Sequence, residues 1–307
     1  MDDATRRTWA ERAVRAVNRA FPKVKFSNWP ECDRLWPHAL ACVKIINDEN
    51  LESSEAARLL NQTGYYLRQR GQLRQPEPLY ERALKTRQRV LGLEHPDTLT
   101  SQNNLAALYS SQGRYSKAEP LYKATLETYQ RVLGLEHPDT LTSQNNLAFL
   151  YERQGRYSEA EPLYEATLET RKRVLGLEHP DTLSSQNNLA NVYESQGRYN
   201  EAEPLYEATL ETYQRVLGLE HPDTLGSQNN LATLYFHQKR YTAAEPLMKS
   251  VAEVGEKIFG LLHPNVATFL KNHAVVLQVL GRVAQAQVQM ERAAAVREAL
   301  ARREQGQ

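Results

Sequence analysis

Apolar residues recur at helical spacing along most of this chain. In the segment that follows Asp97, Leu105, Leu108 and Tyr109 share one side of a helix expected over about residues 98–112, because residues three and four positions apart point the same way. A second helix follows, and its apolar stripe comprises Ala118, Leu121, Tyr122, Leu126 and Val132. No segment alternates apolar and polar residues in the manner of a strand. The pattern therefore predicts a helical hairpin and an all-α chain.

This hairpin pattern repeats with little change. Its marker, the tetrapeptide HPDT, recurs every 42 residues, and a degenerate copy, HPNV, ends the series. The markers begin at His95, His137, His179, His221 and His263. A fixed period of this size is typical of stacked supersecondary units, each of which needs its neighbours to bury its apolar face. We therefore expect six stacked hairpins, over about residues 55–92, 97–134, 139–176, 181–218, 223–260 and 265–303.

The sequence also carries signals for the ends of these helices. Asp97 is positioned to cap the free N–H groups of the first helix, and Gly113 is expected to end that helix in the left-handed conformation. Lys239 takes the place of this glycine in the fifth hairpin, where a left-handed backbone costs about 1 kcal/mol. The second helices begin with the spacing of a capping box. The pairs are Ser116 with Glu119, Ser158 with Glu161, Asn200 with Glu203 and Thr242 with Glu245.

These residues resemble the tetratricopeptide repeat. The matching positions of one copy are Ala106, Tyr109, Gly113, Tyr115, Ala118 and Tyr122. The 42-residue period, with its NNLA, AEPLY and LG-x-x-HPD motifs, is similar to the long variant found in kinesin light chains. The resemblance covers about residues 55–303 and implies a right-handed superhelical solenoid whose first helices line a concave groove. It also implies that a peptide or protein segment binds in that groove.

The first 50 residues differ from the rest. All three tryptophans precede residue 37, whereas all sixteen tyrosines follow residue 64. Residues 1–50 are therefore expected to form a separate helical module ahead of the array at residues 51–307. Two amphipathic helices, over Asp3–Ala20 and Pro30–Asn47, are expected to cover the open end of the first hairpin, as solenoids require. Their candidate inward residues are Trp9, Val14, Val17, Phe21, Leu35, Trp36, Ala39, Val43 and Ile46.

This N-terminal module resembles the segment that joins the nucleotide-binding part to the repeats in NLR-like signalling ATPases of bacteria and fungi. The resemblance rests on Phe21-Pro22, on the W-x-x-C at Trp29 and on the PHALAC stretch from Pro37 to Cys42. It implies that the chain is the sensor arm of a longer protein, with a nucleotide-binding domain on its N-terminal side. A free-standing adaptor like a kinesin light chain is the alternative. The chain contains no G-x-x-x-x-G-K-[ST] phosphate-binding loop of its own.

Composition narrows the classes of partner. Lys and Arg number 38, and Asp and Glu number 37, so no global charge favours nucleic acid or an anionic membrane surface. The two cysteines suit a reducing compartment without a disulfide framework. No apolar run approaches the length of a membrane span. We expect a cytoplasmic protein without membrane or nucleic-acid partners.

The candidates for catalysis or metal binding are few. The HPD triplets place a histidine beside a carboxylate, but they are spread one repeat apart, whereas a catalytic site needs converging groups. Cys32, His38 and Cys42 share one helix, with fewer ligands than a zinc site uses. We expect capping and loop roles for the triplets and packing roles for these three residues. The sequence therefore predicts no enzyme, no metal and no cofactor.

The copies differ mainly on one side of the first helix. Measured from Leu105 on the apolar face, the changing positions fall in an arc roughly 140–240° away, at about 100° per residue. They are Thr100, Thr142, Ser184 and Gly226; Ala107, Phe149, Asn191 and Thr233; Ser110, Glu152, Glu194 and Phe236; and Ser111, Arg153, Ser195 and His237. One interpretation is a solvated surface that is free to drift. The other is a concave face that carries specificity, which Phe149 and Phe236 favour, because a drifting surface is more often polar.

One asparagine of each NNLA motif borders the same arc. The four are Asn103, Asn145, Asn187 and Asn229. A carboxamide both donates and accepts hydrogen bonds, so a ladder of such groups can grip an extended peptide backbone. The resemblance to kinesin light chains implies this role for them. The asparagines that follow lie at the rim of the arc and are candidates to satisfy backbone groups between helices. They are Asn104, Asn146, Asn188 and Asn230.

The predicted peptide-binding site combines this ladder with variable side chains. Besides the four asparagines it contains Tyr65, Arg68, Phe149, Glu152, Arg153, Asn191, Glu194, Phe236 and His237. Both signs of charge are present, so the expected ligand is neither uniformly acidic nor uniformly basic.

Overall fold

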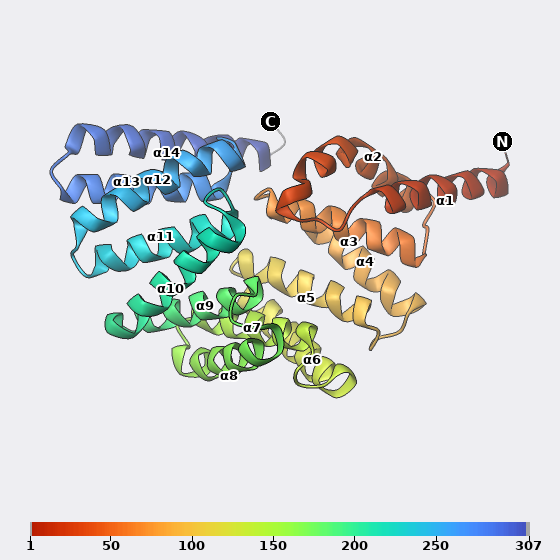
Figure 1. The fold of residues 1–307 in the computed structure, drawn as a ribbon. Coiled ribbons are helices and arrows are strands. Elements are labelled where there is room, and N and C mark those ends of the chain that lie inside the picture. The colour runs from red at the N-terminus through yellow and green to blue at the C-terminus, as the bar shows by residue number, and fades with distance from the viewer. Residues whose placement is uncertain (1, 305–307) are drawn as a thin grey trace. The chain divides into compact units, whose positions relative to one another are not determined.

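The computed structural model describes residues 2–304, and over that range it contains fourteen α-helices, one short 3-10 helix and no strand (Figure 1). The elements are α1 (Asp3–Ala20), η1 (Phe26–Asn28), α2 (Trp29–Asp48), α3 (Ser54–Gln69), α4 (Pro76–Val90), α5 (Pro96–Ser111), α6 (Tyr115–Leu133), α7 (Pro138–Arg153), α8 (Tyr157–Leu175), α9 (Pro180–Ser195), α10 (Tyr199–Leu217), α11 (Pro222–His237), α12 (Tyr241–Phe259), α13 (Pro264–Val279) and α14 (Val283–Glu304). The predicted all-α class is confirmed.

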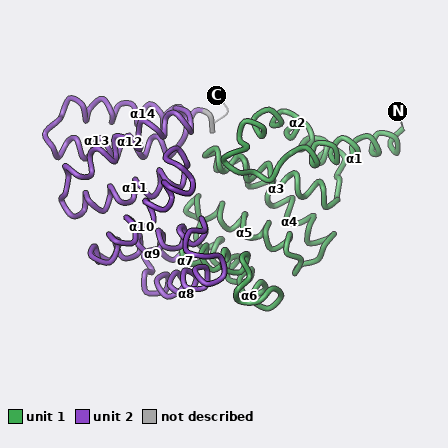
Figure 2. Tube along the Cα trace, in the orientation of Figure 1, with its two compact units in different colours: residues 1–150 green, residues 151–307 purple. Residues whose placement is uncertain are grey.

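The chain divides into two compact units, residues 1–150 and residues 151–307 (Figure 2). In the first unit, α3 pairs with α4 and α5 pairs with α6. In the second, the pairs are α9 with α10, α11 with α12, and α13 with α14. Within each unit the second helix of one pair also packs against the first helix of the next, as α4 does against α5 and α10 against α11. The predicted helical hairpins are therefore confirmed.

The core of each hairpin is made from residues that the repeat holds constant. In the pair α9 and α10, Ala190 and Ala202 are fully buried, and their small side chains allow the two helices to lie close together. The Tyr206 ring fills the space beside them and is fully buried as well. Because each helix is polar on its other side, its stability comes mainly from packing this apolar face.

In the N-terminal module, α1 and α2 both pack on α3. Phe21 is fully buried, and its ring centroid lies 6.4 Å from that of Tyr66 in α3. The half-buried Trp36 approaches the same ring at 5.7 Å. Trp9, which was expected to face inward, is 57% exposed, because the inward side of α1 is occupied by the smaller Ala10 and other buried residues. The module boundary at residue 50 stays a prediction.

The first helices are capped by histidine. The backbone N–H of Asp97 donates to Nδ1 of His95 at 3.1 Å, and His95 is the N-cap residue of α5. The same bond is made by His137, His179, His221 and His263, at 3.1–3.2 Å. The prediction that Asp97 is the cap is wrong, because α5 begins two residues earlier than expected, at Pro96. Asp97 lies in the first turn, where its charge suits the helix dipole.

The predicted capping boxes of the second helices are also wrong. α6 begins at Tyr115, and the side chain of its N-cap residue, Arg114, makes no capping hydrogen bond. Ser116 therefore lies inside the first turn. The turns before these helices are as predicted: Gly113 has a φ of +73° and Lys239 a φ of +62°.

Candidate functional site

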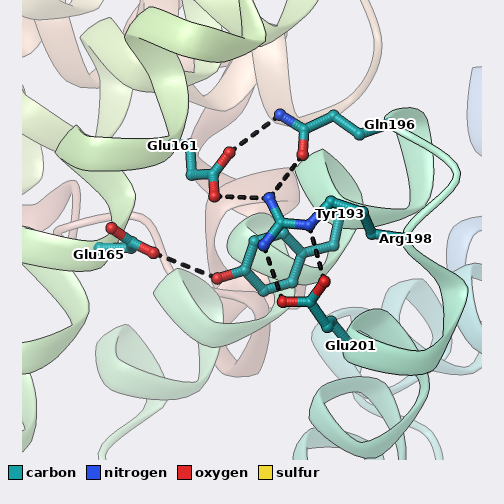
Figure 3. Close-up of polar contacts among 6 residues, drawn as sticks. All are labelled: Glu161, Glu165, Tyr193, Gln196, Arg198 and Glu201. Carbon is teal, nitrogen blue, oxygen red and sulfur yellow. Dashed lines mark hydrogen bonds and ion pairs between the residues drawn. The ribbon is translucent and has the colours of Figure 1, made fainter.

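The best-defined polar contacts join successive repeats. Nη1 of Arg198, just before α10, lies 2.6 Å from Oε1 of Glu161 in α8 (Figure 3). The same guanidinium lies over the Tyr193 ring at 4.0 Å, and its Nη2 pairs with Glu201 at 2.8 Å. A carboxylate and the face of an aromatic ring both stabilise a nearby cation. This inter-repeat cluster therefore fixes how α8, α9 and α10 lie against one another.

Two further bonds complete the inter-repeat cluster. Nε2 of Gln196 donates to Glu161 at 2.9 Å, and the Tyr193 hydroxyl donates to Glu165 at 3.2 Å (Figure 3). Equivalent clusters form from Tyr109, Gln112 and Arg114 with Glu77 and Glu81, and from Tyr235, Gln238 and Arg240 with Glu203 and Glu207. Glu161 and Glu203, which were expected in capping boxes, therefore bind side chains of the next repeat. An arginine there is a stronger hydrogen-bond partner for a carboxylate than a backbone N–H is.

The asparagine ladder is partly used within the array. Asn103 is only 9% exposed, and its Oδ1 accepts a hydrogen bond from the Ser143 hydroxyl at 3.2 Å. Oδ1 of Asn229 accepts from Nδ2 of Asn272 at 3.0 Å. The next repeat therefore covers Asn103. Asn145 and Asn187 are half-buried.

Two of the rim asparagines, Asn104 and Asn230, bind side chains rather than backbone groups. Nδ2 of Asn104 donates to Oδ1 of Asn61 at 3.2 Å, and Nδ2 of Asn230 donates to Oδ1 of Asn191 at 3.1 Å. In both cases an amide of one repeat bonds an amide of the repeat before it. These asparagines consequently help to set the spacing between first helices.

The variable positions do come together within residues 151–307. The Tyr164 hydroxyl donates to Glu152 at 2.9 Å, and the Tyr206 hydroxyl donates to Glu194 at 2.7 Å. Tyr206 also bonds Asn191. Nδ1 of His237 lies 2.8 Å from the other oxygen of Glu194. These residues, Glu152, Asn191, Glu194 and His237 with Tyr164 and Tyr206, are called the carboxylate cluster below.

Burial sets the electrostatics of the carboxylate cluster. It raises the pKa of Glu152 to about 7, with the Tyr164 hydrogen bond and the Arg153 charge opposing it and the Glu194 charge adding to it. Burial also raises the pKa of Glu194, although Tyr206 and His237 oppose the rise. Burial, followed by the charge and the hydrogen bond of Glu194, raises the pKa of Tyr206, so that its hydroxyl stays protonated and can donate.

Sequence reasoning missed the two tyrosines of the carboxylate cluster. Tyr164 and Tyr206 lie on second helices, where their period assigned them to the apolar core, and only their hydroxyls reach the first helices. As a result, Glu152 and Glu194 turn toward their own hairpins and are half-buried, where the sequence suggested an open arc. The signal was present: tyrosine occupies this position in the first four hairpins, whereas a glutamate appears opposite it in only two copies.

Three further predicted site residues differ in their exposure. Phe149 is 40% exposed and Arg153 is exposed. Phe236 is half-buried, 5.3 Å from the Tyr241 ring between centroids, because it fills the fifth hairpin beside Met248. The prediction that Phe236 is exposed is therefore wrong.

Tyr65 and Arg68 lie in α3, in residues 1–150, and both are half-buried. The Arg68 guanidinium lies over the Tyr65 ring at 5.4 Å. The two residues thus support each other through a cation–π contact.

In the part of the chain that the structure describes, no group of three or more His, Cys, Asp or Glu side chains is placed to hold a metal ion, and no helix combines the length and the apolar character needed to cross a membrane. Cys32 and Cys42 are both buried free thiols. Burial, with the charges of Glu31 and Asp33, raises the pKa of Cys32 to about 11, which keeps this thiol protonated.

Comparison with known proteins confirms the resemblance to the tetratricopeptide repeat and the resemblance to NLR-like proteins. A family model described as tetratricopeptide repeat matches residues 55–131, 112–173, 139–215, 181–236 and 223–299. A nucleotide-binding leucine-rich repeat (NLR)-like protein of Hyaloscypha variabilis is 45% identical over 92 residues. That match covers 30% of this chain and 9% of the relative, so the chain corresponds to a small part of that protein's length.

Solved structures of other proteins share the fold of this chain. A putative kinesin light chain from Podosopora anserina, with nearly identical repeats, is 31% identical, with a TM-score of 0.53 over 67% of this chain and 98% of that chain. BtubC from P. vanneervenii is 25% identical, with a TM-score of 0.57 over 74% of this chain and 92% of that chain. NprR in complex with its cognate peptide NprX is 12% identical, covers 94% of this chain and 78% of that chain at a TM-score of 0.70, and shares the fold alone.

Proposed function

Since the chain belongs to the tetratricopeptide repeat family, we propose that it is a scaffold that binds a protein or peptide segment along the first helices of its repeats. The main support for this proposal is the carboxylate cluster. Positions that vary between otherwise constant repeats supply its glutamates, its histidine and Asn191. Variation of this kind is expected where side chains read a ligand, while the packing around them stays fixed.

The ligand that we propose is an extended segment with at least one basic side chain. Glu152 and Glu194 each accept a hydrogen bond from a tyrosine hydroxyl, and burial disfavours their charged forms. A ligand cation beside them would favour the charged forms and gain charge-assisted hydrogen bonds.

Peptide selection would test this function. A random peptide library displayed on phage would be selected on the immobilised chain, and the affinities of the selected peptides would be measured by calorimetry. We expect enrichment of peptides that contain Lys or Arg, and binding at least about tenfold weaker to Glu152→Gln/Glu194→Gln, in line with the loss of one charge-assisted bond. The control Glu178→Gln/Glu220→Gln changes two exposed glutamates outside the carboxylate cluster, which pair with Arg215 in α10 and Lys257 in α12, and it should bind as the wild type does. Equal binding by all three proteins would overturn the assignment of the site.

We further propose that the chain is the ligand-sensing arm of a larger signalling protein with a nucleotide-binding domain on its N-terminal side. The NLR-like relative supports this proposal, because the match covers a small part of a much longer protein. The alternative is a free-standing adaptor, which the kinesin-light-chain structure supports. Sequencing of the full transcript would separate the two: an upstream G-x-x-x-x-G-K-[ST] loop supports the sensor arm, and a stop codon directly upstream supports the adaptor.

A further inference from the structure

The inter-repeat cluster takes a different form at the junction between the last two hairpins. At the junction before it, the Tyr235 hydroxyl donates to Glu207 at 2.9 Å, and the Arg240 guanidinium lies over the Tyr235 ring at 4.1 Å. One period later, the positions of the tyrosine, the glutamate and the arginine hold Leu277, Lys249 and Arg282. The arginine is therefore kept, while its aromatic partner and the acid beside it are lost.

A cavity of about 260 Å³ is lined by Lys249, Leu277 and Arg282, with His273 and Gln285 also at its wall. It is partly open to solvent. Leu277 is buried and carries no ring, so it fills less space than the tyrosine of the earlier junctions. About 150 Å³ is enough to hold a benzene ring in a protein interior. The loss of the tyrosine thus coincides with a cavity that is large enough for one aromatic ring.

Arg282 is held in place at the edge of this cavity. Its Nη1 lies 2.9 Å from Oε1 of Glu245, and its Nε donates to Oε1 of Gln285 at 2.5 Å. Nε2 of His273 lies 3.4 Å from the same Glu245 oxygen. Arg198 has an equivalent glutamate but also lies over a tyrosine ring. The Arg282 guanidinium is consequently positioned for a cation–π contact, and Leu277 offers it no ring.

The charge beside the cavity has changed sign. Among the described residues that line it, none is acidic. Lys249 stands where Glu207 accepts from a tyrosine, and an ammonium group donates hydrogen bonds but accepts none. The Lys249 side chain is 56% exposed, and its Nζ lies 3.9 Å from Oε1 of Glu253, which is longer than a hydrogen bond. A carboxylate next to the cavity would gain a charge-assisted hydrogen bond from it.

We propose that this cavity binds an aromatic ring that carries a carboxylate. The ring takes the place of the absent tyrosine beside Arg282, and the carboxylate pairs with Lys249. A free aromatic acid has this chemistry, and so has a peptide with an aromatic residue beside an acidic one. The site uses α12, α13 and α14 and selects an acid, whereas the carboxylate cluster is proposed to select a base. Failure of one site therefore leaves the other standing.

Saturation-transfer NMR titrations of the whole chain would test the proposal with three probes. They are 4-hydroxyphenylacetate, the peptide acetyl-Tyr-Asp-amide, and tyramine, which has the same ring with an ammonium group. We expect both acids to bind in the millimolar range, as their size allows, and tyramine to bind at least about tenfold more weakly. The acid that binds more tightly identifies the source of the ligand as a small molecule or a peptide.

Two variants and a control locate the binding. Leu277→Tyr places a ring of the chain itself in the cavity and should abolish binding. Lys249→Glu changes an exposed side chain, so it should fold normally and bind both acids at least about tenfold more weakly. The control Val279→Ser changes a residue that is 48% exposed and does not line the cavity, and it should bind as the wild type does. A wild type that binds neither acid, tyramine binding as tight as that of the acids, or undiminished binding by Lys249→Glu would overturn the proposal.

Discussion

Nη1 of Arg198 lies 2.6 Å from Oε1 of Glu161 across the junction of two repeats, where the two side chains are 34% and 22% exposed. Partly buried ion pairs are screened less than exposed ones, and the Tyr193 ring adds a cation–π contact. We expect Arg198→Met, which keeps the apolar stem, to lower the free energy of unfolding by about 1–2 kcal/mol. Urea unfolding measures this, and a double-mutant cycle with Glu161→Gln should give a coupling of about 1 kcal/mol.

The ion pair between Arg215 and Glu178 is the matched control. It also joins successive repeats, at 2.8 Å, but its side chains are 57% and 60% exposed. Exposed pairs contribute little, so the same cycle should give a coupling below about 0.5 kcal/mol. Equal couplings in the two cycles would show that burial and the aromatic ring add nothing to the inter-repeat cluster.

The turn before α12 offers a test of backbone strain. Lys239 has a φ of +62°, in the region that favours glycine. We expect Lys239→Gly to raise the free energy of unfolding by about 0.5–1 kcal/mol, since glycine adopts this conformation without a Cβ penalty. The reverse change, Gly197→Ala, should lower it by about 1 kcal/mol. Gly197 has a φ of +76°, and a Cβ there would meet no atom within 4 Å, so a larger loss would require a cause other than backbone conformation.

Periodicity was sufficient to predict the helices but not their polar partners. The apolar stripes predict the helical hairpins because a helix must bury one face, and that rule depends only on spacing. The start of α5 was misjudged because histidine and aspartate are both able to cap, and only the position of the His95 ring decides between them. The capping boxes failed because Arg198 and its equivalents lie next to Glu161 only after the repeats have stacked.

The candidate site was only partly predictable, because some of its contacts form only when the helices pack together. The variable positions were identified from differences between copies, and the structure joins Glu194 and His237 directly. Their burial was not predictable from one helix, because it depends on Tyr206, which comes from the other helix of the hairpin. The contact of Asn103 was not predictable from one helix either, because its partner, Ser143, belongs to the next repeat.

Two asparagines at equivalent positions should respond differently to the same change. Oδ1 of Asn229 accepts from Asn272 at 3.0 Å, whereas Oδ1 of Asn187 is buried without a hydrogen bond in the described structure. We expect Asn229→Ala to lower the free energy of unfolding by about 1–2 kcal/mol, because Asn272 loses its acceptor. Asn187→Ala should change it by less than about 0.5 kcal/mol, since an unsatisfied group is removed. Thermal unfolding of both variants would decide; an equal loss would mean that Asn187 is also bonded to its neighbours.

Glu152 should make stability depend on pH. Its pKa is raised from 4.5 to about 7 in the folded chain, so between these values the folded state binds more protons than the unfolded state, and the free energy of unfolding falls as pH rises. Glu152→Gln keeps an acceptor for Tyr164 but carries no charge. We expect it to be more stable than the wild type at pH 8 by about 1–2 kcal/mol, and nearly equal to it at pH 5.

The control for Glu152 is Glu178→Gln. The Arg215 guanidinium, through its hydrogen bond and then its charge, holds the pKa of Glu178 below its usual value. Stability from Glu178 is therefore present above the unfolded pKa and lost as pH falls, so its removal should not stabilise the chain at pH 8. Urea unfolding of both variants at pH 5 and pH 8 gives the comparison. If the Glu152→Gln difference does not change with pH, the carboxylate is solvated in the folded chain, and the argument that a basic ligand side chain would favour its charged form no longer holds.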